Sequence, residues 1–225
     1  QGDLHRFDGY TFQGLDELVR EGTLSSFVQA LAEDDAGRIH IGTLQDGLFV
    51  LDPVHSHIEP VQVASGSPAL PGGRIDALLY QPGVGLWIAW PGGIGCFDTQ
   101  TGHSREALDF ELSPSQSEEV TLTRSVRTLA LDGDGVLWAG ANHGVYRIDT
   151  SSGQSAQYSS AGADALLVDA SGDLWIGAHD GLRRKPRDAA DATLVWPHRP
   201  LSGEGACCEV IALAQLIGAA ITRTA

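Results

Sequence analysis

The sequence predicts an all-β chain built from repeated four-stranded sheets, and three observations support this fold class. Short apolar runs, mostly of about four to eight residues, alternate with glycine-containing turns along most of the chain, as in strands joined by hairpins. One pattern of runs and turns recurs several times. Helical periodicity is nearly absent, since the one short candidate, 15–20, spans only about two turns.

The recurring pattern is a glycine turn, an apolar run with a ring near its centre, a short polar turn and a second apolar run. The clearest copy is 172–182, and 135–145 matches it position by position. The stretch 37–48 matches with one extra residue in its turn, and 85–94 is a more divergent copy. Further apolar runs precede and follow each copy, so the repeat holds several strands.

The ring position sets the period of the repeat. It is occupied by His40, Trp87, Trp138 and Trp175, which are 47, 51 and 37 residues apart. A period of about 40–50 residues with several strands in each copy is typical of β-propeller blades. The predicted fold is therefore an all-β β-propeller of four-stranded blades. We expect the tryptophans to pack between blades and His40 to be a packed core ring, rather than to bind a ligand.

The repeats also predict the organisation of the whole chain, 1–225, as a single β-propeller domain or a fragment of one. A partial blade is expected at each end of the chain. If the leading strand completes the trailing blade, the ring has five blades and is closed by both termini; otherwise the chain is a piece of a longer or assembled ring. The complete blades are predicted at about 27–64, 74–109, 125–160 and 161–198, and the partial ones at 2–12 and 207–225.

The residues of the repeat carry a resemblance to a known family. Val-x-Ala-Leu-x-x-Asp, then Gly-x-Leu-Trp-Ile-Gly-Thr, then Gly-Leu and a basic–apolar–Asp ending resembles the two-component regulator propeller repeat, over roughly residues 2–200. The second blade departs from this pattern at Ala89 and Trp90. In that family such repeats build the extracytoplasmic sensor region of membrane histidine kinases and diguanylate cyclases. The resemblance therefore implies a non-catalytic, periplasmic sensor module whose signalling output lies outside these residues.

Composition narrows the classes of partner. A net charge of −15 disfavours nucleic acid and anionic membrane surfaces, because phosphate binding needs a basic surface. The most apolar stretch, 210–221, is too short to cross a membrane, so no membrane insertion is expected in this segment. The absence of methionine and of a signal peptide predicts that the chain is part of a larger precursor.

No cofactor, metal site or enzyme motif is predicted. The three cysteines lack metal-binding spacing, and no nucleophile elbow, phosphate loop or zinc-protease motif is present. His55 and His57 alternate, as two metal ligands on one strand face would. The preceding Asp52-Pro53 indicates a surface turn instead.

The candidate binding residues lie in the turns between the second and third strands of each blade. If the strands of a blade run outward from the ring axis, these turns share one rim with the connections between blades. They are the most variable part of the repeat, and their polar and aromatic side chains suit a small-molecule or glycan ligand. Plain solvent-exposed turns are the alternative. The candidates are Gln45, Asp46, Trp90, Asn142, His143, His179 and Asp180.

Two other functions stay open. His143 and His179 are expected to occupy equivalent rim positions in neighbouring blades, and lyases occur on propellers with tryptophan-rich repeats that resemble these, so acid–base catalysis is one alternative. The partial blades motivate another, an assembly scaffold or homo-oligomer completed by blade sharing between chains. The basic stretch 183–187, on a predicted outer strand, is either a solvated edge or a contact to a partner.

Overall fold

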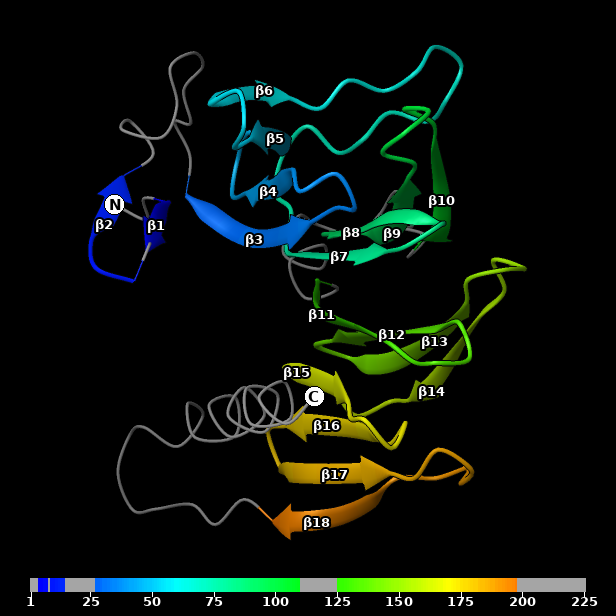
Figure 1. Ribbon diagram of the computed structural model, residues 1–225. Helices are drawn as coiled ribbons and strands as arrows, with labels where there is room; N and C mark the ends of the chain where they lie inside the picture. Colours follow the sequence, from blue (N-terminus) through cyan, green and yellow to red (C-terminus); the bar gives the residue numbers. More distant parts are fainter. Residues whose placement is uncertain (1–3, 8, 15–26, 110–124, 198–225) are drawn as a thin grey trace. The chain divides into compact units, whose positions relative to one another are not determined.

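The structure is a computed structural model that describes residues 4–7, 9–14, 27–109 and 125–197 (Figure 1). In this part of the chain every regular element is a β-strand. None of its residues belongs to a helix long and apolar enough to cross a membrane. The chain divides into an N-terminal unit, Gln1–Ser113, and a C-terminal unit, Pro114–Ala225, and each unit is described by itself.

The N-terminal unit contains two four-stranded antiparallel sheets, in each of which consecutive strands are neighbours. The first strands of the two sheets, β3 and β7, lie against each other. The first sheet consists of β3 (Val28–Glu33), β4 (Ile39–Thr43), β5 (Leu48–Asp52) and β6 (His57–Pro60). The second sheet consists of β7 (Ala77–Gln81), β8 (Gly85–Trp90), β9 (Gly93–Phe97) and β10 (Ser104–Asp109).

The C-terminal unit repeats this arrangement, with β11 lying against β15. The third sheet consists of β11 (Val126–Leu131), β12 (Val136–Ala141), β13 (Gly144–Asp149) and β14 (Ser155–Ser159). The fourth sheet consists of β15 (Ala165–Val168), β16 (Leu174–Ala178), β17 (Gly181–Lys185) and β18 (Thr193–Pro197). The predicted all-β class with four-stranded antiparallel sheets is confirmed, and closure into a ring stays a prediction.

The ring position is tied to the end of the first strand of its own sheet. The Trp138 Nε1–H donates to Asp132 Oδ2 at 3.1 Å, and the Trp175 Nε1–H donates to Asp169 Oδ2 at 2.8 Å. In the second sheet the acceptor is a glutamine, Gln81, at 2.8 Å from Trp87 Nε1. This bond explains why the ring follows the polar residue at a constant spacing.

Packing between sheets explains the glycine two residues after the ring. A Cβ on Gly42 would lie 2.6 Å from Cγ2 of Ile75, and a Cβ on Gly140 would lie 3.2 Å from Cβ of Ala163. Ile75 and Ala163 are the residues just before the next sheet, and the Ile75 N–H donates to the Thr43 carbonyl at 2.8 Å. Glycine therefore lets the following sheet approach closely.

Of the tryptophans at the ring position, Trp138 packs between sheets as predicted. Trp87 is fully buried, and Trp138 lies in a buried cluster with Leu174 and Ile176 of the next sheet. The Trp138 ring also meets Tyr158 edge to face, with centroids 5.3 Å apart. Trp175 is half-buried. A buried core cluster thus lies between the two sheets of each unit, and the first sheet holds a further cluster of Ile41, Leu51 and Ile58.

The N-terminal stretch differs from the single outer strand predicted for 2–12. It forms a hairpin of β1 (His5–Phe7) and β2 (Phe12–Gly14), which pair with each other. Gly9 has a φ of 101°, which favours glycine and lets the chain reverse, and the rings of Phe7 and Phe12 stack at 4.7 Å. The other predicted partial blade, 207–225, and the helical candidate at 15–20 lie outside the described residues.

Candidate functional site

The strand register places the candidate turns beside the connections between sheets. Val28, at the start of β3, pairs with Thr43 at the end of β4, and Val126 pairs with Ala141 in the same way. The turn after the second strand therefore lies at the end where the first strand begins. Backbone bonds from Ile75 to Thr43 and from Ala163 to Ala141 join neighbouring sheets at this end. We call it the rim of each unit.

In the N-terminal unit, the first rim turn holds Gln45 and Asp46 exposed at its tip. The turn itself is rigidly bonded, because the Thr43 hydroxyl donates to the Gly47 carbonyl at 2.9 Å and accepts from the Asp46 N–H at 2.9 Å. The Gly47 N–H also donates to the carbonyl of Gly73 in the connection to the second sheet, at 2.9 Å. Both candidate side chains thus stand on a fixed backbone.

Trp90 is placed differently from the other candidates, because it is the last residue of β8 rather than a turn residue. Its indole lies over two glycines of the next strand, since a Cβ on Gly93 or Gly95 would come within 3.1 Å or 3.0 Å of ring atoms. The ring is half-buried and packs against the core of this unit. It therefore presents only part of its surface to a ligand.

In the C-terminal unit, the rim turns hold Asn142 and His179 at their first position and His143 and Asp180 at their second. The two histidines therefore occupy equivalent turns but different positions within them, which corrects the expected equivalence. His143 is half-buried with its ring 5.9 Å from that of Tyr146, whereas His179 is exposed.

Asp180 is engaged by a neighbouring cation. Both terminal nitrogens of the Arg183 guanidinium donate to its carboxylate, with Nη1 at 2.6 Å from Oδ1. These bonds hold the pKa of Asp180 below its ordinary value. A ligand that uses Asp180 would therefore meet a bidentate ion pair rather than a free carboxylate.

Sequence reasoning missed a second row of rim residues, at the start of the first strands. Arg127 Nη1 lies 3.0 Å from Asp164 Oδ1, which joins the third and fourth sheets. In the N-terminal unit, Arg74 pairs with Asp76, whose side chain is almost fully buried. The sequence did contain a signal. In the apolar run that precedes each copy of the repeat, the second residue is polar or charged: Gln29, Asp76, Arg127 and Asp164.

The histidine pair at 55 and 57 does not share a strand face. His55 lies in the turn before β6, with Nδ1 at 2.6 Å from Asp52 Oδ2. His57 lies on β6, with Nε2 at 3.4 Å from Glu59 Oε2. Within the described ranges, no group of three or more histidine, cysteine, aspartate or glutamate side chains could hold a metal ion.

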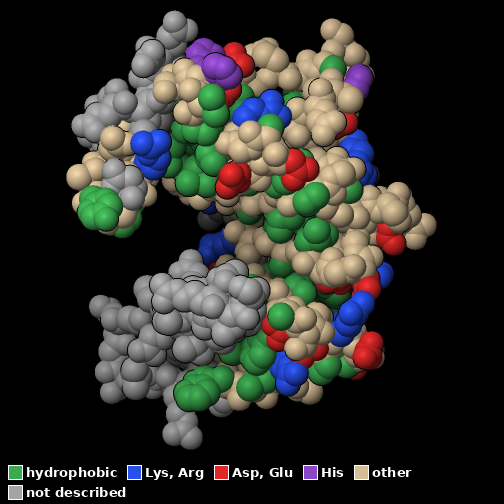
Figure 2. Space-filling model, in the orientation of Figure 1, with side chains coloured by type: hydrophobic (Ala, Val, Ile, Leu, Met, Phe, Trp, Pro, Cys, Tyr) green, Lys and Arg blue, Asp and Glu red, His purple; other side chains and the backbone are tan. Residues whose placement is uncertain are grey.

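The basic stretch 183–187 belongs largely to the third strand of its sheet, β17, and not to an outer strand. Arg184 Nε donates to Asp173 Oδ2 at 2.7 Å, and Arg187 Nε donates to Asp134 Oδ2 at 3.1 Å. The Arg187 N–H donates to Asp173 Oδ1 at 2.8 Å. These contacts lie within the C-terminal unit. On the face drawn in Figure 2, basic side chains lie among acidic ones.

Comparisons with known proteins extend only to the fold. No family model matches the chain. No curated protein matches its sequence significantly. The resemblance to the two-component regulator propeller repeat therefore stays an inference from the residues.

Solved structures share the fold at low sequence identity. The extracellular domains of two proteins assigned as hybrid two-component systems from B. thetaiotaomicron align with TM-scores of 0.67 and 0.62, at 19% and 17% identity. They cover 87% and 83% of this chain, which spans about a quarter of their length (27% and 24%). A catalytically inactive virginiamycin B lyase from Staphylococcus aureus with quinupristin aligns with a TM-score of 0.66 at 15% identity, covering 91% of this chain and 69% of its own.

Proposed function

We propose that the chain is a non-catalytic recognition module of an extracytoplasmic signalling protein and that its rim binds a polyhydroxylated ligand such as a carbohydrate. The observation that carries the proposal is the rim itself. Regular sheets hold short, backbone-bonded turns whose exposed side chains differ from sheet to sheet. Variable polar tips on a constant scaffold are typical of a binding surface.

The chemistry of the rim supports this class of ligand. Gln45, Asn142 and His179 are exposed side chains that can donate and accept hydrogen bonds. In the C-terminal unit, the Arg127–Asp164 pair adds a charged donor and a charged acceptor to the rim. Sugar hydroxyls need such mixed partners, and the half-buried Trp90 offers apolar surface for a sugar ring. The extracellular two-component neighbours support the sensor role through shared fold alone.

The experiment is calorimetric titration of the 225-residue chain with a panel of mono- and oligosaccharides, followed by rim variants. If a saccharide binds to the C-terminal unit, Asn142→Ala is expected to weaken its binding. If it binds to the N-terminal unit, Gln45→Ala is expected to do so. The matched controls are Ser171→Ala and Gln100→Ala, because both residues are exposed in turns at the opposite end of the sheets and offer only their backbone N–H to the turn. Equal loss in rim and control variants, or no binder in the panel, contradicts the proposal.

A lyase is the second candidate, favoured by the two histidines on one rim of the C-terminal unit. General acid–base catalysis needs groups within reach of one substrate. His143 is half-buried, whereas His179 is exposed and lies at a different position of its turn. This arrangement favours joint catalysis by the two rings less than equivalent positions would. Turnover of quinupristin that is lost in both His143→Ala and His179→Ala would favour the lyase over the recognition module.

A further inference from the structure

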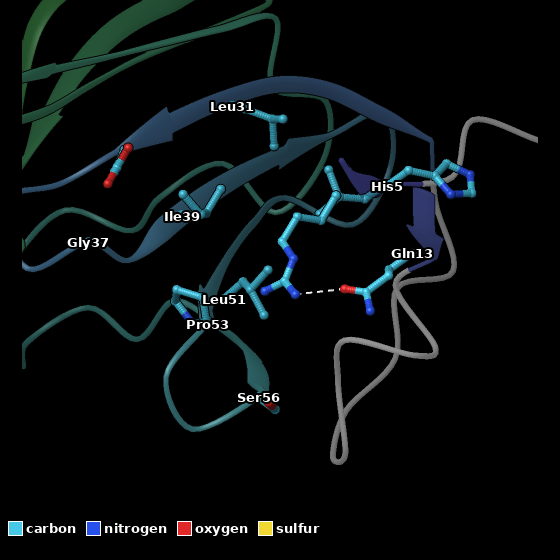
Figure 3. Close-up of a pocket in the computed structure, with 11 residues that line it drawn as sticks. His5, Gln13, Leu31, Gly37, Ile39, Leu51, Pro53 and Ser56 are labelled. Carbon is cyan, nitrogen blue, oxygen red and sulfur yellow. Dashed lines mark hydrogen bonds between the residues drawn. The ribbon is translucent and has the colours of Figure 1, made fainter. Parts of the chain in front are cut away.

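A groove lies between the N-terminal hairpin and one face of the first sheet, away from the rim residues discussed above (Figure 3). Its volume is about 460 Å³, within the range of about 300–1,000 Å³ typical of small-molecule sites. Its floor is apolar and consists of Leu31, Ile39, Leu51 and Pro53. On the hairpin side the groove is lined by Leu4, His5, Arg6 and Gln13.

The groove exists because this sheet face has only a partial cover. In the second and fourth sheets, the corresponding face packs against the preceding sheet of the same unit. On the first sheet, this face is covered from the side of the hairpin, where Leu4 packs against it. Leu31 is still 48% exposed. A two-stranded hairpin covers less of the face than a four-stranded sheet would.

Arg6 places a positive charge in the groove. One of its Nη atoms donates to Gln13 Oε1 at 2.7 Å, drawn as the dashed line in Figure 3. Among the residues that the structure describes, Arg6 makes no ion pair, whereas Arg38, Arg127 and Arg183 each meet an aspartate. In a chain with a net charge of −15, an arginine that has no acidic partner among the described residues is available to an external anion.

We propose that this groove binds a small amphipathic monoanion. The apolar body lies on Leu31, Ile39 and Leu51, and a carboxylate or sulfonate meets the guanidinium of Arg6. The Gln13 amide, already held by Arg6, can donate its own N–H groups to the same anion. Glu33 also lines the groove, and its carboxylate disfavours a second negative charge on the ligand.

The test uses two fluorescent probes that share an apolar body and differ in charge. These are 8-anilinonaphthalene-1-sulfonate, an anion, and N-phenyl-1-naphthylamine, which is neutral. Titration of the full chain is expected to give one saturable site that prefers the anion. Arg6→Gln is expected to weaken sulfonate binding about tenfold or more, as for a lost charge-assisted hydrogen bond. It should leave the neutral probe nearly unchanged.

Three further variants keep the result interpretable. Arg6→Lys retains the charge and should retain most of the affinity, whereas Leu31→Glu should remove binding of both probes. Arg147→Gln is the matched control, because Arg147 is exposed on β13 and forms no ion pair with another described residue. Near-UV circular dichroism of each variant separates a lost site from a lost fold.

Several outcomes would overturn the proposal. One is that the wild-type protein and Arg6→Gln bind the sulfonate probe with equal affinity while both proteins are folded. Another is equal weakening by Arg147→Gln, which would indicate non-specific attraction. A third is failure of the wild-type chain to bind either probe while light scattering shows a dimer, which would indicate that a second copy fills the groove. Loss of rim sugar binding leaves this proposal unaffected, since the two sites share no residue.

Discussion

His40 Nε2 lies 3.0 Å from Asp34 Oδ2, and both side chains are almost fully buried, at 2% and 1% exposed. This pair takes the place of the tryptophan–aspartate bond found in the third and fourth sheets. Arg38 binds the same carboxylate oxygen at 2.8 Å and also donates to the Thr99 carbonyl at 3.0 Å. The first sheet therefore replaces an apolar ring with a buried titratable group, and this makes its stability sensitive to pH.

Acidification from pH 7 to pH 5 is expected to lower the free energy of unfolding through His40. Burial lowers the pKa of His40 below its ordinary 6.5 and outweighs the hydrogen bond that the ring donates to Asp34, which raises it. The unfolded chain then binds the proton more readily than the folded one, so stability falls as pH drops through this range. Urea unfolding at several pH values measures the effect.

The variant His40→Gln isolates this contribution, because glutamine keeps a donor for Asp34 and does not titrate. Its stability should change less between pH 7 and pH 5 than that of the wild type. His179→Gln, at an exposed position, should behave like the wild type. Burial opposes ionisation of Asp34, but hydrogen bonds from His40 and Arg38 lower its pKa below 3.8, so its own contribution is lost only at lower pH. Identical pH dependence in all three proteins would contradict the assignment.

Gly140→Ala is expected to destabilise the C-terminal unit by about 1–3 kcal/mol, as for an overpacked core. The new methyl group would lie 2.6 Å from Cγ2 of Thr128 and 3.1 Å from the Ala163 carbonyl oxygen. Gly133→Ala is the control, since no atom lies within 4 Å of a Cβ there. Denaturant unfolding of both variants tests the claim that close sheet contact requires this glycine. Equal stability of the two variants would refute it.

Trp138→Ala is expected to cost about 3–5 kcal/mol of unfolding free energy, the usual range for a buried tryptophan. The change removes contacts with Leu174 and Ile176 of the next sheet and the hydrogen bond to Asp132. Trp196→Ala should change stability by only about 0.5 kcal/mol, because Trp196 is 65% exposed on β18. Thermal unfolding followed by circular dichroism distinguishes the two, and similar losses would mean that Trp138 is not a core residue.

The rim pair Arg127–Asp164 is expected to contribute little to folding. Its side chains are 50% and 33% exposed, and exposed pairs at about 3 Å typically couple by about 0.2–1 kcal/mol. A double-mutant cycle with Arg127→Gln and Asp164→Asn measures this coupling directly. It should shrink further at high salt. A coupling energy well above that range would mean that the pair stabilises the contact between the third and fourth sheets and is not kept for ligand recognition.

The positions of the strands could be predicted from the sequence because their signals are local. Alternating apolar runs and glycine turns mark each hairpin, and the four sheets fall where the repeat of His40, Trp87, Trp138 and Trp175 indicates. The hairpin of β1 and β2 was the exception, because the stretch 2–12 resembles a single strand that ends a blade, whereas the chain reverses at Gly9 and its two halves pair with each other.

The turns of the candidate rim could be located from the sequence for the same reason, but the contacts of their side chains could not. Arg127 meets Asp164 across 37 positions, and Arg187 meets Asp134 across 53. The groove beside Arg6 needs the hairpin and three strands of the first sheet together. The sequence by itself determined the repeat, its strands and its turns, because strand and turn formation depends on neighbours along the chain. Only the tertiary structure decided which charges are paired and which surfaces stay open, because that depends on how separate sheets pack.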